Sequence, residues 1–86
     1  MTGQEKQLRR IRDKRCKNVK FDELCSLVES YGFELDRTRG SHHIYKHPRF
    51  QGIVNIQKPH HGSDVQPRIC KQALDAVQEV IEYYEE

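Results

Sequence analysis

The sequence has few cysteines and no long apolar run, and each shortage argues against a class of protein. Its three cysteines, Cys16, Cys25 and Cys70, cannot all pair within one chain and form no Cys-x-x-Cys element, which argues against a disulfide scaffold or a cysteine-only zinc site. No apolar stretch approaches the roughly 18 residues of a bilayer span, and no apolar signal region follows the basic start. We therefore expect a protein of the cytoplasm that does not enter membranes.

Familiar catalytic motifs are also missing. The chain has no Gly-Lys-Ser/Thr phosphate loop and no Gly-x-Ser-x-Gly elbow, so nucleotide hydrolysis and serine esterase chemistry lack their minimum parts. Cys25 and Cys70 fall on apolar helical stripes, where thiols act as small hydrophobes, and Cys16 falls in a basic segment. None of the three is expected to be a nucleophile.

Charge is divided unevenly along the 86 residues, a length that suits one small domain. Residues 1–20 hold eight Lys or Arg against two acidic residues, a net charge of +6, and the remainder carries −4. Such a segment attracts RNA or DNA through counterion release, although many basic tails are only solvated or dock on partners. We interpret residues 1–20 as a basic N-terminal extension, flexible or a short amphipathic helix carrying Leu8 and Ile11.

Hydrophobic periodicity predicts the order helix, three strands, helix. Apolar side chains recur at three- and four-residue steps from Phe21 to Tyr31 and from Ile69 to Tyr84, which is typical of helices with one apolar face. A period of two predicts a half-buried strand from Phe33, a second strand over 42–47 and a third over 53–57, with 48–52 as a connection. We expect an α+β fold in which two helices cover one face of a three-stranded antiparallel sheet and leave the other face open.

Candidate chemistry centres on the five histidines, because imidazole titrates near about 6.5 and suits proton transfer. All of them fall between the second strand and the loop after the third, namely His42, His43, His47, His60 and His61. If Ile44 points into the core, strand alternation puts His42 on the covered side and His43, with Tyr45 and His47, on the open face. We therefore interpret His42 as a partly buried histidine and His43 as the functional one, with Arg37 and Arg39 nearby to hold a phosphate.

Zinc binding is the competing explanation for so many histidines. The adjacent pairs His42-His43 and His60-His61 diverge in an extended chain and do not have the spacing of zinc ligands. We expect neither a metal nor a cofactor.

Three segments carry the most distinctive residues: Tyr31-Gly32-Phe33, Arg37-Thr38-Arg39-Gly40-Ser41-His42-His43-Ile44-Tyr45 and Val54-Asn55-Ile56-Gln57. Together they resemble the HicA toxins of bacterial HicA–HicB toxin–antitoxin systems, and the Gly-Ser-His-His turn is the most specific element. The resemblance implies a fold like that of a double-stranded-RNA-binding domain over residues 21–86. It also implies a metal-independent ribonuclease that cleaves messenger RNA and is neutralised by a HicB antitoxin. The histidine that the family uses closes the Gly-Ser-x-His turn, which is His43 here.

A mechanism follows from histidine chemistry. Neutral His43 is predicted to remove the proton of a ribose 2′-hydroxyl, so that this oxygen attacks the adjacent phosphate, while Arg37, Arg39 or Lys46 stabilises the developing charge. A second group must protonate the leaving oxygen, and three histidines stay open for this role: His47, His60 and His61. RNA contacts are expected at seven positions: Arg37, Arg39, Gly40, Ser41, His42, Lys46 and Lys58.

Two other functions remain compatible with the sequence. One is a non-catalytic module that holds double-stranded RNA by its 2′-hydroxyls and phosphates, with His43 as a hydrogen-bond donor. The other is an interaction protein whose basic segment docks on an acidic partner, for which little salt-dependent RNA binding is expected. The sequence makes no prediction about the oligomeric state.

Overall fold

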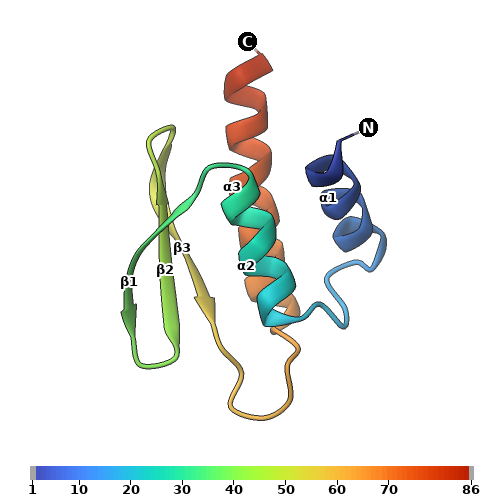
Figure 1. Cartoon of the computed structure of the whole chain (residues 1–86), viewed down its shortest axis with the longest axis vertical. Helices are drawn as coiled ribbons and strands as arrows, with labels where there is room; N and C mark the ends of the chain where they lie inside the picture. Colours follow the sequence, from blue (N-terminus) through green and yellow to red (C-terminus); the bar gives the residue numbers. More distant parts are fainter. Residues whose placement is uncertain (1, 86) are drawn as a thin grey trace.

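The computed structural model describes residues 2–85 and contains three helices and one sheet (Figure 1). In chain order the elements are α1 (Gly3–Asp13), α2 (Phe21–Ser30), β1 (Glu34–Arg39), β2 (His42–His47), β3 (Phe50–Gln57) and α3 (Pro67–Glu85). The strands pair antiparallel in the order β1-β2-β3. The predicted α-β-β-β-α fold is confirmed, and α1 precedes it as a further helix.

The molecule is layered, with the sheet on one side of α2 and α3 and with α1 on the other side (Figure 1). Buried side chains of all three helices join one hydrophobic core with Val54 and Ile56 of β3 and Tyr45 of β2. The prediction that two helices cover one face of the sheet is therefore confirmed for α2 and α3.

Helix α1 packs on the other helices through its two apolar residues. Thr2 caps it, because its hydroxyl accepts a hydrogen bond from the backbone N–H of Glu5 at 3.1 Å. An isolated helix of 11 residues is marginal in water, but Leu8 and Ile11 are buried in the shared core. Burial of each such side chain is worth about 1.5–3 kcal/mol, so the basic segment gains its structure from tertiary packing.

The two faces of β2 are the reverse of those predicted. His43, Tyr45 and His47 lie on the helix-covered side, where Phe21 of α2 contacts the His43 ring and the Tyr45 hydroxyl donates to Glu29 Oε2 at 2.7 Å. The open face instead carries His42, Ile44 and Lys46. The predicted positions of His42, His43 and His47 relative to the helices were therefore wrong.

The reason lies in Ile44, which sequence analysis assigned to the core. Alternation fixes which residues share a face but not which face the helices cover. The register pairs His43 with Ile56 and Tyr45 with Val54, and these two β3 residues belong to the core. Ile44 is also buried, but it lies outside the core cluster. A prediction based on the hydrophobicity of Ile44 alone therefore assigned the wrong face of β2 to the helices.

Two strand predictions also need correction. Every residue of β1 is exposed, whereas a half-buried strand was expected; only Phe33, just before the strand, is buried. The helices pack against β3 rather than against this edge strand, so the alternation in β1 has no core to face. β3 begins at Phe50 rather than at residue 53, because Phe50 already pairs with His47 across a tight hairpin.

Candidate functional site

Three connections meet at one end of the molecule, which we call the loop end: residues 14–20 between α1 and α2, 40–41 between β1 and β2, and 58–66 between β3 and α3 (Figure 1). Backbone hydrogen bonds join them. Lys58 N–H donates to Ser41 O at 2.8 Å, and Phe21 N–H donates to Ser63 O at 2.8 Å. Val65 N–H donates to Val19 O, also at 2.8 Å. Segments far apart in the sequence therefore form one surface here.

His43 lies at the border of the loop end, in the second position of β2. The preceding turn contains Gly40 at a φ of +58°, a backbone conformation that favours glycine. The half-buried ring of His43 meets the Phe21 ring edge-on, with centroids 4.9 Å apart and an interplanar angle of 73°. Nδ1 lies 3.4 Å from Ser41 O. Because a carbonyl only accepts, this contact favours the tautomer that carries its proton on Nδ1, in which Nε2 keeps its lone pair.

His42 occupies the other face of the same strand. Its Nδ1 lies 3.1 Å from Asn55 Oδ1 on the open side of the sheet, and since an amide oxygen only accepts, Nδ1 donates. The two adjacent histidines therefore point to opposite sides of the sheet and do not share a ligand.

His47 shares the covered face with His43 but serves the packing of the far end of the sheet. The ring is buried, with its centroid 5.0 Å from that of Phe33 and 6.4 Å from that of Tyr84. Its Nδ1 accepts a hydrogen bond from Arg49 N–H at 2.9 Å. His47 lies four residue steps along the strand from His43, roughly 13 Å at the usual rise. The structure therefore does not bring His43 and His47 together.

Three of the predicted cations lie away from His43. The register pairs Arg37 with Ile44 and Arg39 with His42, which places both arginines on the open face with Lys46. Asp36 binds both Arg37 and Lys46, the latter at 3.6 Å, and this carboxylate offsets part of their charge. The phosphate-holding cluster expected around Arg37 and Arg39 is thus separated from His43 by the sheet.

Lysines of the loop end lie on the side of His43 instead. A small pocket of about 150 Å³ is bounded by Lys20, Phe21, Asp22, Lys58, Pro59, Gly62 and Ser63, and Phe21 is also the wall of the His43 ring. Lys58 is among the predicted RNA contacts, but sequence reasoning missed Lys20. No spacing pattern marks that residue, because four of the six other residues that line the pocket come from a segment some 40 positions away.

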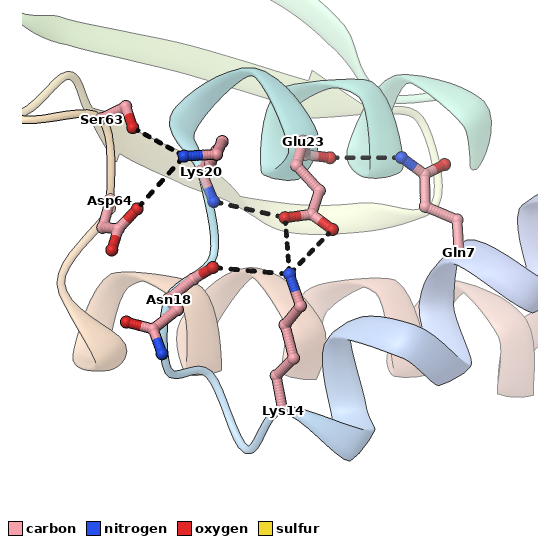
Figure 2. A network of polar contacts seen from close by, with 7 residues as sticks. All are labelled: Gln7, Lys14, Asn18, Lys20, Glu23, Ser63 and Asp64. Carbon is pink, nitrogen blue, oxygen red and sulfur yellow. Dashed lines mark hydrogen bonds and ion pairs between the residues drawn. The ribbon is translucent and has the colours of Figure 1, made fainter.

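Polar contacts fix the surroundings of Lys20 (Figure 2). Its Nζ lies 3.1 Å from Ser63 Oγ and 4.0 Å from Asp64 Oδ1, and its backbone N–H donates to Glu23 Oε1 at 3.3 Å. The same Glu23 carboxylate pairs with Lys14 Nζ at 3.3 Å. An acidic side chain in the first turn of α2 also suits the positive end of the helix dipole. The network ties residues 14–20 to α2 and to the connection 58–66.

Several other features of residues 2–85 bear on the chemistry. His60 and His61 are exposed in the connection at the loop end. Within the described range, no group of three or more His, Cys, Asp or Glu side chains is placed to hold a metal ion. The same range contains no helix with the length and apolar character needed to cross a bilayer. A hollow of about 730 Å³ lies between α1, the end of α2 and the last turns of α3, and no histidine lines it.

Comparison with known families supports the resemblance seen in the sequence. A family model for the HicA toxin of bacterial toxin–antitoxin systems matches residues 21–78, more than half of the chain. The chain belongs to the HicA toxin family. The HicA match starts at the first residue of α2 and ends within α3, so α1 and the connection 14–20 precede it. No curated protein matches the chain.

Proposed function

We propose that this HicA-family toxin is an endoribonuclease that cleaves messenger RNA by histidine acid–base chemistry and is neutralised by a HicB-type antitoxin. Family membership supports its place in a toxin–antitoxin system. The observation that carries the chemistry is the contact of His43 Nδ1 with the Ser41 carbonyl oxygen at 3.4 Å. A carbonyl only accepts, so the tautomer that makes this hydrogen bond leaves Nε2 free to accept a proton.

The reaction uses the ribose as its own nucleophile. His43 Nε2 takes the proton of the 2′-hydroxyl, the 2′-oxygen attacks the adjacent phosphorus, and the bond to the 5′-oxygen breaks. The products are a 2′,3′-cyclic phosphate and a 5′-hydroxyl, once a second group has protonated the leaving oxygen. DNA lacks the 2′-hydroxyl and is not cleaved.

The other residues proposed for the site lie either at the loop end, on the side of His43, or on the open face of the sheet. Exposed His60 and His61 lie in the connection 58–66 at the loop end, so either is placed better than buried His47 to supply the second proton. Gly40 and Ser41 form the turn next to His43, and Lys58 is bonded to that turn; we propose all three as RNA contacts. Four further proposed contacts, Arg37, Arg39, His42 and Lys46, lie on the open face, where they would bind flanking RNA rather than the reacting phosphate.

Replacement of His43 tests the proposal directly. Purified protein is incubated with RNA in excess chelator, and we expect wild type to produce fragments that end in a cyclic phosphate. His43→Ala should slow cleavage by at least about 100-fold, since general acid–base catalysis is worth about 10² to 10⁴ in rate. The melting temperature should change little, because the His43 ring is only half-buried. RNA binding should also change little, because the proposed role of His43 is proton transfer and other residues hold the RNA.

Controls separate catalysis from binding. An RNA with a single 2′-deoxyribose at the cleaved position should resist wild-type protein. A loss below tenfold in His43→Ala, or cleavage of the deoxy-substituted RNA, would reject the mechanism. Binding without fragments from wild type would identify a non-catalytic RNA-binding module instead. Growth arrest on induction, absent with His43→Ala and relieved by co-expression of the neighbouring open reading frame, tests toxicity and the antitoxin together.

A further inference from the structure

We propose that residues before the HicA match complete the RNA site: Lys20, from the connection 14–20, acts with Lys58 to bind a substrate phosphate beside His43. The inference rests on the proposed function for the identity of the ligand. It assigns a role to a segment that the family match, residues 21–78, does not include.

The connection 14–20 is built into the fold, and this fixes where Lys20 lies. Val19 is fully buried, and its carbonyl accepts from Val65 N–H at 2.8 Å. Arg15, Cys16 and Asn18 have φ values of 55°, 61° and 55°, a left-handed conformation that costs roughly 1 kcal/mol or more per non-glycine residue. Packing must offset that cost, so the path of this segment from α1 to α2 is held by its tertiary contacts.

Lys20 and Lys58 reach the same pocket from different segments. Both line the hollow of about 150 Å³ at the start of α2, and Asp22 is the one carboxylate in that lining. No carboxylate of residues 2–85 lies within 4.0 Å of Lys58 Nζ. Lys20 has only Asp64, at 4.0 Å, and both side chains are about half exposed or more. Exposed pairs of this kind contribute about 0–1 kcal/mol. A bound anion can therefore replace Asp64 as the partner of the Lys20 ammonium group at little cost in free energy.

Two contacts join this pocket to His43. The Phe21 ring lines the pocket and meets the His43 ring edge-on, with centroids 4.9 Å apart. Ser41 O accepts from Lys58 N–H at 2.8 Å and lies 3.4 Å from His43 Nδ1. The pocket that the two lysines line therefore adjoins His43 across the Phe21 ring. An RNA phosphate is the anion that follows a ribose along the chain, so a ribose at His43 would present a phosphate toward this pocket. The arginines of β1 do not offer this, because they lie on the opposite face.

Binding across a salt series tests the inference, with His43→Ala as background so that the RNA stays intact. We expect Lys20→Ala and Lys58→Ala each to weaken binding of a short single-stranded RNA by about fivefold. The double variant should reduce the slope of log affinity against log salt by about 0.7, the value for one phosphate. The matched control is Lys6→Ala, which removes the same charge from α1, outside the pocket lining, and should keep the slope.

The outcomes are separable from those of the proposed function. Lysine variants that behave like Lys6→Ala while wild type still cleaves RNA would overturn the inference and leave the ribonuclease standing. Lysine effects that persist although wild type cleaves nothing would support the phosphate site and reject the ribonuclease. A slope loss near 1.4 in the double variant would show two separate phosphates and would overturn the shared site. Melting temperatures of the variants should match the parent, since both lysines are exposed.

Discussion

At the scale of single residues, His43 and His47 show how two histidines on the same face of one strand acquire different roles. Both face the helices, yet His43 borders the loop end and remains half-buried, whereas His47 is buried among aromatic rings. The sequence predicted a histidine cluster but not this difference, because the depth of each ring depends on partners distant in the chain. Phe21 is 22 positions from His43, and Tyr84 is 37 positions from His47.

Gly32 illustrates such a distant constraint and gives a prediction. Its φ is +91°, and a Cβ added there would lie 3.0 Å from His47 Nε2. Gly32→Ala therefore meets both backbone strain and a buried ring, and we expect a loss of about 2 kcal/mol or more in the free energy of unfolding. Gly40→Ala is the matched control, because its φ is +58° but no atom lies within 4 Å of the added Cβ; about 1 kcal/mol is expected. Equal losses in chemical denaturation would contradict the role of the His47 contact.

At the scale of elements, periodicity predicted which segments become helices and strands, and contacts between elements decided the rest. The apolar stripes of α2 and α3 end in the core as expected. Which face of β2 they cover could not be predicted, because Ile44 is more apolar than Tyr45 in isolation. Tyr45 is nevertheless the better core residue here, since its ring packs inward while its hydroxyl reaches Glu29 of α2 at 2.7 Å.

The hydrogen bond between Tyr45 of β2 and Glu29 of α2 makes the free energy of unfolding depend on pH under alkaline conditions. Burial, together with the hydrogen bond to Glu29, raises the pKa of Tyr45 above its usual value near 10. The folded state therefore holds the Tyr45 proton more tightly than the unfolded state does. The protonated phenol makes its full contribution to the free energy of unfolding below about pH 10, and this contribution is lost as the pH rises further. We expect wild type to lose more free energy of unfolding between pH 9 and 11 than Tyr45→Phe loses, as measured by urea denaturation. Tyr83→Phe, at an exposed phenol, should follow wild type; if Tyr45→Phe does so too, the buried phenol is not the cause.

At the scale of the whole molecule, the question is whether α1 belongs to the same cooperative unit as the HicA-matched region. The sequence indicated only that residues 1–20 are basic and that Leu8 and Ile11 have helical spacing. The structure joins them to a core that reaches α3, with Ile11 and Val77 both fully buried. The sequence shows the amphipathic spacing of Leu8 and Ile11, but the apolar surface on which they pack forms only when α2 and α3 pack together.

The three cysteines report on this unit, because they lie in different segments and all are buried: Cys16 before α2, Cys25 in α2 and Cys70 in α3. Burial also raises the pKa of the Cys25 and Cys70 thiols, which lowers the thiolate fraction available to an alkylating reagent. We expect all three to be protected in native protein and to become reactive in a single transition as urea is added.

Ile11→Ala sharpens that prediction. Removing this fully buried side chain should cost about 2–5 kcal/mol, whereas Arg10→Ala, at an exposed position of the same helix, should cost less than about 0.5 kcal/mol. If α1 and the HicA-matched region unfold together, mass spectrometry will show Cys16, Cys25 and Cys70 labelled at the same, lowered urea concentration in Ile11→Ala. Labelling of Cys16 well before Cys70 would instead show that α1 detaches by itself, and Lys20 would then be held by its contacts with Ser63, Asp64 and Glu23, without support from α1.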